Sequence, residues 1–466
     1  MTKYNTTTLE NGLRVIHLPS NSPVVYCGIG VNAGSRQEAE GEEGVAHFCE
    51  HVTFKGTRKR SALQILNCLE QVGGDLNAFT NKEDTIFYAA ILKEHLPRAV
   101  DLLTDIVFQS VYPEEEIRHE TDVICDEIES YNDTPAELIY DEFENMIFHG
   151  HPLGHNILGT RERVQGFTAD HARRFTSRYY RPDNAVFFVY GDVDFDRLTT
   201  KILKPTPYPS RTGGESKMTS SEKDTVTDTI ADTVTDTIAD TVTDTIADTV
   251  TDTIADTVTD TIADTVTDTI ADTAAGVTEL PSRSGGAGGG FHGSHHQAHV
   301  MLGSRTFDYN DERRMPLYLL NNILGGPGMN ARLNLSLRER HGLVYTVESS
   351  MGSYSDTGCW SVYFGCDHHD VKRCLKLVNR ELDRMMQHPL SDRQLAAAKR
   401  QLKGQIAIAC DNREQYALDF AKNFLHYGRE RSIDDLLQHI DAITASQMQD
   451  VAQEVFHPDR LSTLIL

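Results

Sequence analysis

The chain has 466 residues, of which 39% are hydrophobic and 24% charged, enough to bury the cores of two or three domains. Its formal net charge is −25, which argues against nucleic acid as a partner, because binding phosphates requires a basic surface. No run of 18 apolar residues is present, so no membrane-spanning helix is expected, and we expect no membrane partner.

The negative charge is unevenly distributed. Residues 224–272 hold 13 aspartates and no lysine or arginine, which leaves 56 acidic against 44 basic residues elsewhere, a net charge of −12. The first 19 residues contain no apolar signal core, which predicts a cytoplasmic protein. The eight cysteines form no C-x-x-C pair, and their scatter indicates reduced thiols rather than a disulfide framework.

The stretch GVAHFCEHVTF, residues 44–54, predicts a helix with His47, Glu50 and His51 on one face. Two imidazoles one turn apart can bind one zinc ion, and the glutamate between them is placed to take a proton from water. A solvated helix face is the alternative interpretation. The apolar residues on both sides of the motif disfavour it, because unpaired histidines and a carboxylate are costly to bury.

A catalytic zinc usually has three protein ligands, so a third must come from elsewhere. The segment PEEEIRHETDVICDEIESY, residues 113–131, predicts a helix that places Glu120 and Glu127 on one face. The residues predicted to face the core are Ile117, Val123, Ile124 and Ile128. Spacing alone does not choose between the two glutamates, and a charged surface face is the alternative for either.

Sequence patterns recur in the two halves of the chain. A strand, a short turn and an amphipathic helix are predicted at 85–107 and again at 358–382. A capped helix, an aromatic-x-Pro-Asp turn and a strand are predicted at 168–191 and again at 444–466. The separations agree, because Phe87 and Pro182 are 95 residues apart while Phe364 and Pro458 are 94 apart. We therefore expect two homologous α+β domains, each a mainly antiparallel sheet covered by helices.

A low-complexity segment separates the halves. The octad DTVTDTIA occurs six times in register over residues 224–271, followed by the Gly-rich stretch SRSGGAGGG. One small apolar residue in four leaves little surface to bury, which favours a disordered spacer over local β structure. The predicted organisation is a first domain at 1–205, a linker at 206–290 and a second domain at 291–466.

Several motifs together resemble the pitrilysin/insulinase family of zinc peptidases, in its small two-domain bacterial type, which is similar to mitochondrial processing peptidase. In the first half they are LENGLRVIHLP, GVAHFCEHVTFKGT, GGDLNAFTNKEDTIFY, HETDVICDEIESYNDTP and HPLGHNILGT. In the second half they are LGGPGMNARL and LRERHGLVYTVES. The resemblance covers both halves and leaves out the repeats.

The resemblance implies a set of site residues. It implies that His47, His51 and Glu127 bind one Zn²⁺ per chain, that Glu50 is the general base, and that Glu120 supports the site from behind its ligands.

The resemblance also implies that the second half contributes Arg338 and Tyr345 to catalysis by contacting substrate. Without it, they would be a helix-end arginine and a core tyrosine. It implies further that Asn77, Ala78 and Phe79 bind peptide as an added strand. Their alternative interpretation is a turn that leads into a strand.

The implied function is that of a zinc metalloendopeptidase, which hydrolyses peptides or unfolded protein segments with a zinc-activated water. The alternative is a non-catalytic structural or assembly subunit of the same fold, which an intact metal motif disfavours. The expected partners are peptide substrates and a second copy of the chain in a homodimer, with a related subunit as the alternative to the second copy.

Overall fold

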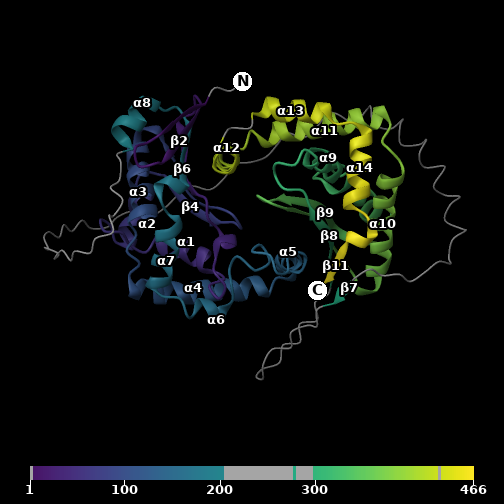
Figure 1. Ribbon diagram of the computed structural model, residues 1–466, viewed down its shortest axis with the longest axis horizontal. Coiled ribbons are helices and arrows are strands. Elements are labelled where there is room, and N and C mark those ends of the chain that lie inside the picture. Colours follow the sequence, from purple (N-terminus) through teal and green to yellow (C-terminus); the bar gives the residue numbers. More distant parts are fainter. Residues whose placement is uncertain (1–3, 204–276, 280–296, 429–431) are drawn as a thin grey trace, which may run out of the picture. The chain divides into compact units, whose positions relative to one another are not determined.

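The computed structural model describes residues 4–203, 277–279, 297–428 and 432–466 of the chain. These residues form two β-sheets with their helices (Figure 1). Apart from 277–279, the predicted linker and its DTVTDTIA repeats lie outside the described residues.

The first sheet has six strands in the order β1-β2-β6-β3-β5-β4. Neighbouring strands are antiparallel, except that β2 and β6 run parallel. The strands are β1 (Asn5–Thr8), β2 (Arg14–Pro19), β3 (Val24–Val31), β4 (Asp75–Thr80), β5 (Thr85–Leu92) and β6 (Ala185–Gly191).

Three helices of the first half, α1, α3 and α7, bury one face of this sheet. Side chains alternate between the faces of a strand, so Val25, Cys27 and Ile29 of β3 share a core with those helices. The longer helices are α1 (Val45–Thr53), α2 (Ala62–Glu70), α3 (Leu96–Gln109), α4 (Glu114–Asn132), α5 (Pro135–Ile147) and α7 (Ala169–Tyr179). The short helical segments are η1 (Ser35–Gln37), η2 (Lys93–His95), α6 (Arg161–Val164), η3 (Pro182–Asn184), α8 (Phe195–Arg197) and η4 (Leu198–Ile202).

Helix α4 corresponds to the helix predicted at 113–131. Ile117, Ile124 and Ile128 are buried as predicted, but the prediction for Val123 was wrong, because its exposed fraction is 52%. At 3.6 residues per turn, Val123 lies about 120° around the helix from the line of the three isoleucines. Its side chain therefore points away from the core.

The second sheet has five strands in the order β7-β11-β8-β10-β9. The first sheet has the same order from β2 onward, β2-β6-β3-β5-β4, and in both the first of these pairs is parallel and the others antiparallel. The strands are β7 (Val277–Glu279), β8 (Ala298–Thr306), β9 (Val344–Ser353), β10 (Gly358–Cys366) and β11 (Ser462–Ile465). Strand β7 is thus the counterpart of β2, although it lies within the segment predicted as a linker.

The helices of the second half follow the recurrence seen in the sequence. Strand β10 and helix α10 correspond to β5 and α3, and helix α14 and strand β11 correspond to α7 and β6. The helices are α9 (Arg314–Gly325), α10 (Val371–Gln387), α11 (Asp392–Ala409), α12 (Arg413–Tyr427), α13 (Ile433–Ala442) and α14 (Ala445–Val455), with short segments η6 (Asn334–Glu339), η7 (His368–Asp370) and η8 (Pro458–Arg460). The prediction of two similar α+β halves is confirmed.

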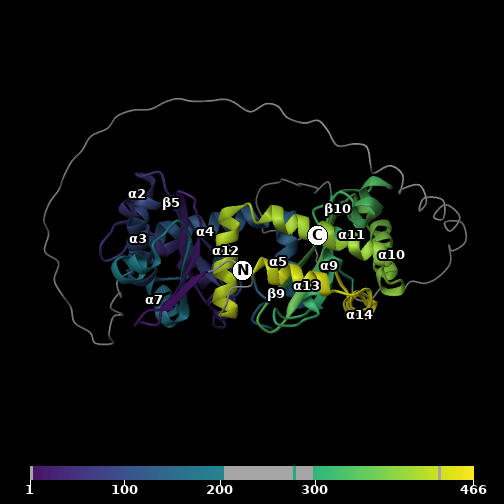
Figure 2. The same ribbon diagram turned by 90° about the horizontal axis from the view of Figure 1, so that it is seen from above.

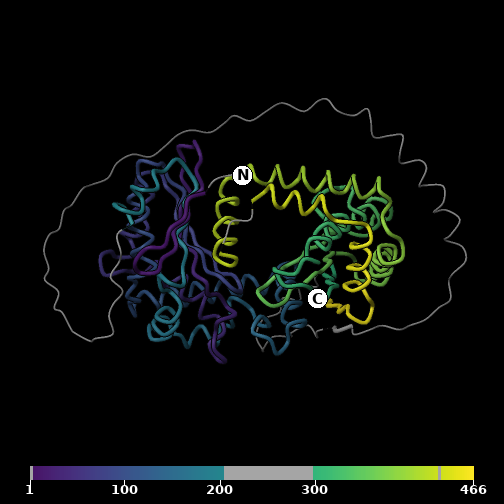
Figure 3. The backbone as a smooth tube through the Cα atoms, turned by 45° about the horizontal axis from the view of Figure 1, so that its top comes forward, coloured from purple at the N-terminus to yellow at the C-terminus, as the bar shows by residue number. Residues whose placement is uncertain are grey.

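Each sheet also receives one helix from the other half. Helix α12 covers the second face of the first sheet, where Phe420 and Phe424 pack with Ile16 and Phe188 (Figures 2 and 3). Helix α5 of the first half packs on the second sheet in the same way. The small core between them consists of Ile139, Phe143, Met301, Tyr363 and Leu464. Each half therefore has a main core of its own, and two smaller cores are shared between the halves.

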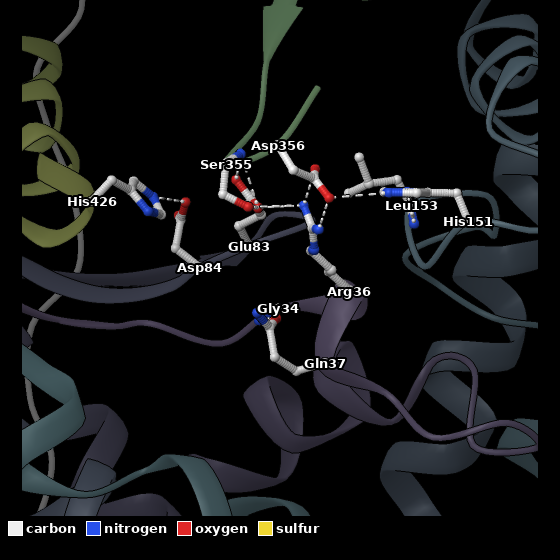
Figure 4. A network of polar contacts seen from close by, with 10 residues as sticks. All are labelled: Gly34, Arg36, Gln37, Glu83, Asp84, His151, Leu153, Ser355, Asp356 and His426. Atoms are coloured by element: carbon white, nitrogen blue, oxygen red, sulfur yellow. Dashed lines mark hydrogen bonds and ion pairs between the residues drawn. The ribbon is translucent and has the colours of Figure 1, made fainter. Parts of the chain in front are cut away.

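Polar contacts join the halves as well (Figure 4). The Arg36 guanidinium donates hydrogen bonds to Glu83 Oε1 at 2.8 Å and to Asp356 Oδ1 at 2.8 Å. The backbone N–H of Ser355 donates to Glu83 Oε2 at 3.0 Å. Glu83 lies in the turn between β4 and β5, and Ser355 and Asp356 lie in the turn between β9 and β10. The turns of two corresponding hairpins thus contact each other.

Both sheets belong to one compact unit of the chain, so the predicted domain boundaries at 205 and 291 stay a prediction. Within the described ranges, no helix combines the length and the apolar character that crossing a membrane requires. All eight cysteines are free thiols, as predicted, and six of them are buried.

Candidate metal centre

Helix α1 is fixed at its start by a buried carboxylate. Glu38 accepts hydrogen bonds from the backbone N–H of Gly44 at 2.9 Å and of Ala46 at 2.7 Å. These groups have no partner within the helix, so the carboxylate caps it. Gly44 has φ of 98°, a left-handed conformation that favours glycine. The cap fixes where the helix begins and therefore which side chains face α4.

His47 and His51 point to the same side of α1, toward Glu127 on α4. The two imidazole centroids are 4.5 Å apart. Glu127 places Oε1 at 3.8 Å from His47 Nε2 and Oε2 at 3.4 Å from His51 Nε2. The structure therefore brings together the three side chains for which the resemblance implied a ligand role.

The three side chains fit a zinc ion. In a tetrahedral zinc site with ligand distances of about 2.0–2.2 Å, ligand atoms lie about 3.3–3.5 Å from one another. One ligand atom from each of His47, His51 and Glu127 lies within 4.8 Å of the other two, so small side-chain movements would close the site. His47 Nδ1 is buried without a hydrogen-bond partner among the described residues. Nε2 of the same ring faces Glu127, so it is the nitrogen placed to bind a metal together with that carboxylate.

The pKa values of the two histidines shift in opposite directions. Burial, with a smaller effect of neighbouring His51, lowers the pKa of His47 to about 4. His47 is thus neutral near pH 7, the state in which an imidazole binds metal. Burial also acts to lower the pKa of His51, but hydrogen bonds to Glu120 and Glu127 outweigh it and raise this pKa to about 9. The two carboxylates thus favour the protonated form of His51.

Glu120 contacts the opposite side of the His51 ring. His51 Nδ1 lies 2.9 Å from Glu120 Oε1. Because a carboxylate only accepts, Nδ1 carries the hydrogen of this bond, and Nε2 faces Glu127. Glu120 therefore sets the tautomer that a metal ligand needs.

Glu50 is buried beside the histidines and has one hydrogen-bond donor that the sequence did not reveal. Thr80 Oγ1, at the end of β4, donates a hydrogen bond to Glu50 Oε2. Burial raises the pKa of the Glu50 carboxyl, and the Thr80 hydrogen bond offsets part of that rise. A carboxylate with a raised pKa next to a metal site is suited to accept a proton near neutral pH.

Asn77, Ala78 and Phe79 lie in β4, the edge strand of the first sheet. In the described part of the chain, β4 pairs with β5 on one side and with no strand on the other. The same strand ends at Thr80, which contacts Glu50. An extended peptide added to this open edge would therefore run toward the acid–base residue.

Arg338 and Tyr345 are neighbours in the second half. The Arg338 guanidinium carbon is 5.9 Å from the centroid of the Tyr345 ring, and Tyr345 is 80% exposed. Both line a cavity of about 700 Å³ between α9, β9 and α11. Across the described ranges, neither makes a hydrogen bond or ion pair with His47, His51 or Glu127. Their contact with substrate stays a prediction.

The same cavity occupies the place in the second half that the metal centre has in the first. Ala78 pairs with Phe87 and Val347 pairs with Phe364, so Thr80 corresponds to Ser349. Ser349 Oγ donates a hydrogen bond to Asn321, as Thr80 does to Glu50.

Asn321 thus corresponds to Glu50, which aligns Tyr318 with His47 and Asn322 with His51. Gln405 is the fourteenth residue of α11, as Glu127 is of α4. All four side chains line the cavity, and none is a histidine, cysteine or carboxylate. The second half has the frame of the site without its ligands.

Comparisons with known proteins agree with a first half that carries the candidate ligands and a second half that lacks them. Residues 14–161 match the family model for insulinase (Peptidase family M16), and residues 166–204 with 290–402 match the Peptidase M16 inactive domain. The chain is 32% identical to an uncharacterised zinc protease of Streptomyces coelicolor, over 96% of this chain and 86% of that protein. It is 28% identical to the uncharacterised zinc protease YmxG of Bacillus subtilis, over 98% of this chain and 97% of that protein.

Solved structures show the same fold. A crystal structure of a protease from Helicobacter pylori superposes with a TM-score of 0.79 at 20% identity, covering 100% of both chains. A peptidase M16 inactive domain from Pseudomonas fluorescens superposes with a TM-score of 0.75 at 17% identity, covering 99% of this chain and 97% of the other. The chain belongs to the insulinase family, Peptidase family M16.

Proposed function

We propose that the chain is a zinc-dependent metalloendopeptidase that hydrolyses peptides or unfolded protein segments, with one zinc ion per chain. The observation that carries this proposal is the convergence of His47, His51 and Glu127, with Glu50 buried beside them. The names of the related zinc proteases support it. The second-half counterpart of the site lacks ligands, which supports one ion per chain.

Each residue has a role that follows from its position. His47, His51 and Glu127 would hold the ion, which when bound lowers the pKa of water toward 7 and polarises a peptide carbonyl. Glu50 accepts the proton of the attacking water at its carboxylate and then passes it to the leaving amine. The edge of β4, at Asn77, Ala78 and Phe79, would orient the substrate backbone by hydrogen bonds.

The roles of Arg338 and Tyr345 belong to the same proposal. A guanidinium and a phenol can both donate hydrogen bonds to a peptide carbonyl. Their exposure and their shared cavity leave them accessible to a peptide.

A non-catalytic subunit of the same fold is the second candidate. The match of the second half to an inactive domain is compatible with it. The complete His47, Glu50, His51 and Glu127 set favours the enzyme, because a structural subunit has no need of a buried base next to metal ligands.

The decisive experiment compares the full-length chain with Glu50→Gln on a quenched peptide library, alongside measurement of bound zinc. The wild type is expected to cleave and to hold one zinc ion. The variant is expected to keep its zinc and lose at least about 100-fold in kcat/KM, because only the base is removed.

Two controls sharpen the result. A second, exposed group of possible ligands at Asp367, His369 and Asp370 could bind added metal, so His369→Ala is the matched variant and should change neither zinc content nor cleavage. A wild type that holds zinc but cleaves nothing would contradict the enzyme proposal and favour the structural subunit. Light scattering on the same sample would test the proposed homodimer against a monomer or a need for a related subunit.

A further inference from the structure

A lysine lies directly behind the metal centre. Lys55 follows α1, four residues after His51, and its Nζ is 2.5 Å from Glu120 Oε2. Glu120 Oε1 is 2.9 Å from His51 Nδ1. Contacts therefore run without a break from the lysine ammonium through one carboxylate to the ring that faces Glu127.

The two contacts use both oxygens of Glu120. The Glu120 side chain is only 10% exposed and that of Lys55 26%. A carboxylate this buried needs a partner of opposite charge. With one oxygen held by Lys55 and the other by His51, its plane cannot turn without breaking a bond.

Lys55 also balances charge at the site. Glu50, Glu120 and Glu127 all lie beside the two histidines. Within the described residues, Lys55 is the one lysine or arginine that forms an ion pair with any of the three. Without it, Glu120 would have no fixed cation when a metal occupies the histidines, and its orientation toward Nδ1 would be set by His51 alone.

We propose that Lys55 is a positioning residue of the metal centre, which holds the Glu120 carboxylate in place to accept the Nδ1 hydrogen of His51 and so keeps Nε2 of that ring free for zinc. The inference rests on the proposed zinc site. It assigns Lys55 no contact with substrate.

The test measures zinc affinity by competition with a chromophoric chelator on the full-length protein, which needs no peptidase activity. Lys55→Met is expected to weaken zinc binding about tenfold, the lower end of the effect of supporting residues behind metal ligands. Lys55→Arg keeps the charge and should restore the affinity to within about threefold of wild type.

Two further variants separate positioning from general destabilisation. Lys59→Met is the matched control, because Lys59 is 61% exposed and pairs with Asp101 away from the site. It should bind zinc as wild type does. In the double variant Lys55→Met/Glu120→Gln, the losses should not add, since both changes break the same chain of contacts.

The outcomes are distinguishable. If wild type binds zinc and Lys55→Met binds it equally well, or if the double variant shows additive losses, the role of Lys55 is refuted while the proposed function stands. If wild type binds no zinc, both fall. Should Lys55→Met fail to fold, Lys55→Gln replaces it, with the same tenfold loss expected because the charge is again removed.

Discussion

The two largest effects on the pKa of the Glu50 carboxyl oppose each other. Burial raises it, and the hydrogen bond from Thr80 lowers it. Glu50 accepts a proton only in its ionised form. In the proposed enzyme, the pKa of Glu50 therefore sets the pH below which kcat/KM falls. Thr80, the last residue of the edge strand β4, therefore adjusts the acidity of Glu50.

Removing the Thr80 hydroxyl should move the pH profile in a known direction. In Thr80→Val the group that lowers the Glu50 pKa is gone, so that pKa rises further and less Glu50 is ionised at a given acidic pH. The acid limb of kcat/KM is expected to shift to higher pH. Thr80→Ser keeps the hydroxyl and should retain the wild-type limb. Coincident acid limbs for the two variants would disprove this role.

For single residues, the sequence predicted that His47, Glu50 and His51 lie on one side of a helix. Positions i, i+3 and i+4 share a helix face whatever the tertiary structure. The sequence could not choose Glu127 over Glu120 without the family resemblance. It could not predict the contacts of Thr80 with Glu50 or of Lys55 with Glu120. These join segments 30 and 65 residues apart, so they depend on how α1, β4 and α4 pack.

Among the elements, α1 depends on a cap that comes from outside the helix. The Glu38 carboxylate satisfies two backbone N–H groups at its start, and His155 Nε2 lies 2.9 Å from the same carboxylate. Because the proposed metal ligands His47 and His51 are in the first two turns, loosening this end would move them. The cap therefore connects helix stability to metal binding.

Replacing the cap should cost stability and metal affinity together. Glu38→Ala is expected to lower the free energy of unfolding by about 1–2 kcal/mol, as for other lost helix caps. Glu38→Gln keeps one acceptor and should lose less. Denaturant unfolding and zinc competition would measure the two effects. A Glu38→Ala protein as stable as wild type would show that the helix start is held by packing instead.

For helices and strands, the sequence predictions were reliable where apolar residues recur with a helical or strand period. The strand–turn–helix units recurred as predicted, whereas Val123 was misplaced because an apolar residue was assigned to the core without its helical angle. Strand β7 was missed because a three-residue strand in a Gly- and Ser-rich neighbourhood has no period to detect. Only its pairing with β11 identifies it.

For the whole molecule, the two sheets carry the same frame with different side chains. Tyr318, Asn322 and Gln405 stand where His47, His51 and Glu127 stand in the first half. The neutral replacements keep polar groups in the cavity but remove every metal ligand. The same frame thus carries a candidate metal centre in one half and a counterpart without metal ligands in the other.

Introducing two histidines and a glutamate at the corresponding positions of the second half should create a zinc site there. The triple variant Tyr318→His/Asn322→His/Gln405→Glu is expected to bind a second zinc ion, because the three positions correspond to His47, His51 and Glu127 and line one cavity. Made in the His369→Ala background, it should hold two ions by elemental analysis, and Tyr318→His alone should hold one. A triple variant that unfolds like wild type yet holds one ion would mean that the backbone frames differ.

Helix α5 packs on the second sheet and helix α12 on the first, which bears on whether the two halves need to be joined by one chain. Each half supplies the helix that shields the other half's sheet, so the halves are held by reciprocal burial as well as by the peptide backbone that connects them. A polypeptide nicked between residues 209 and 274 should therefore persist as a complementing pair of fragments.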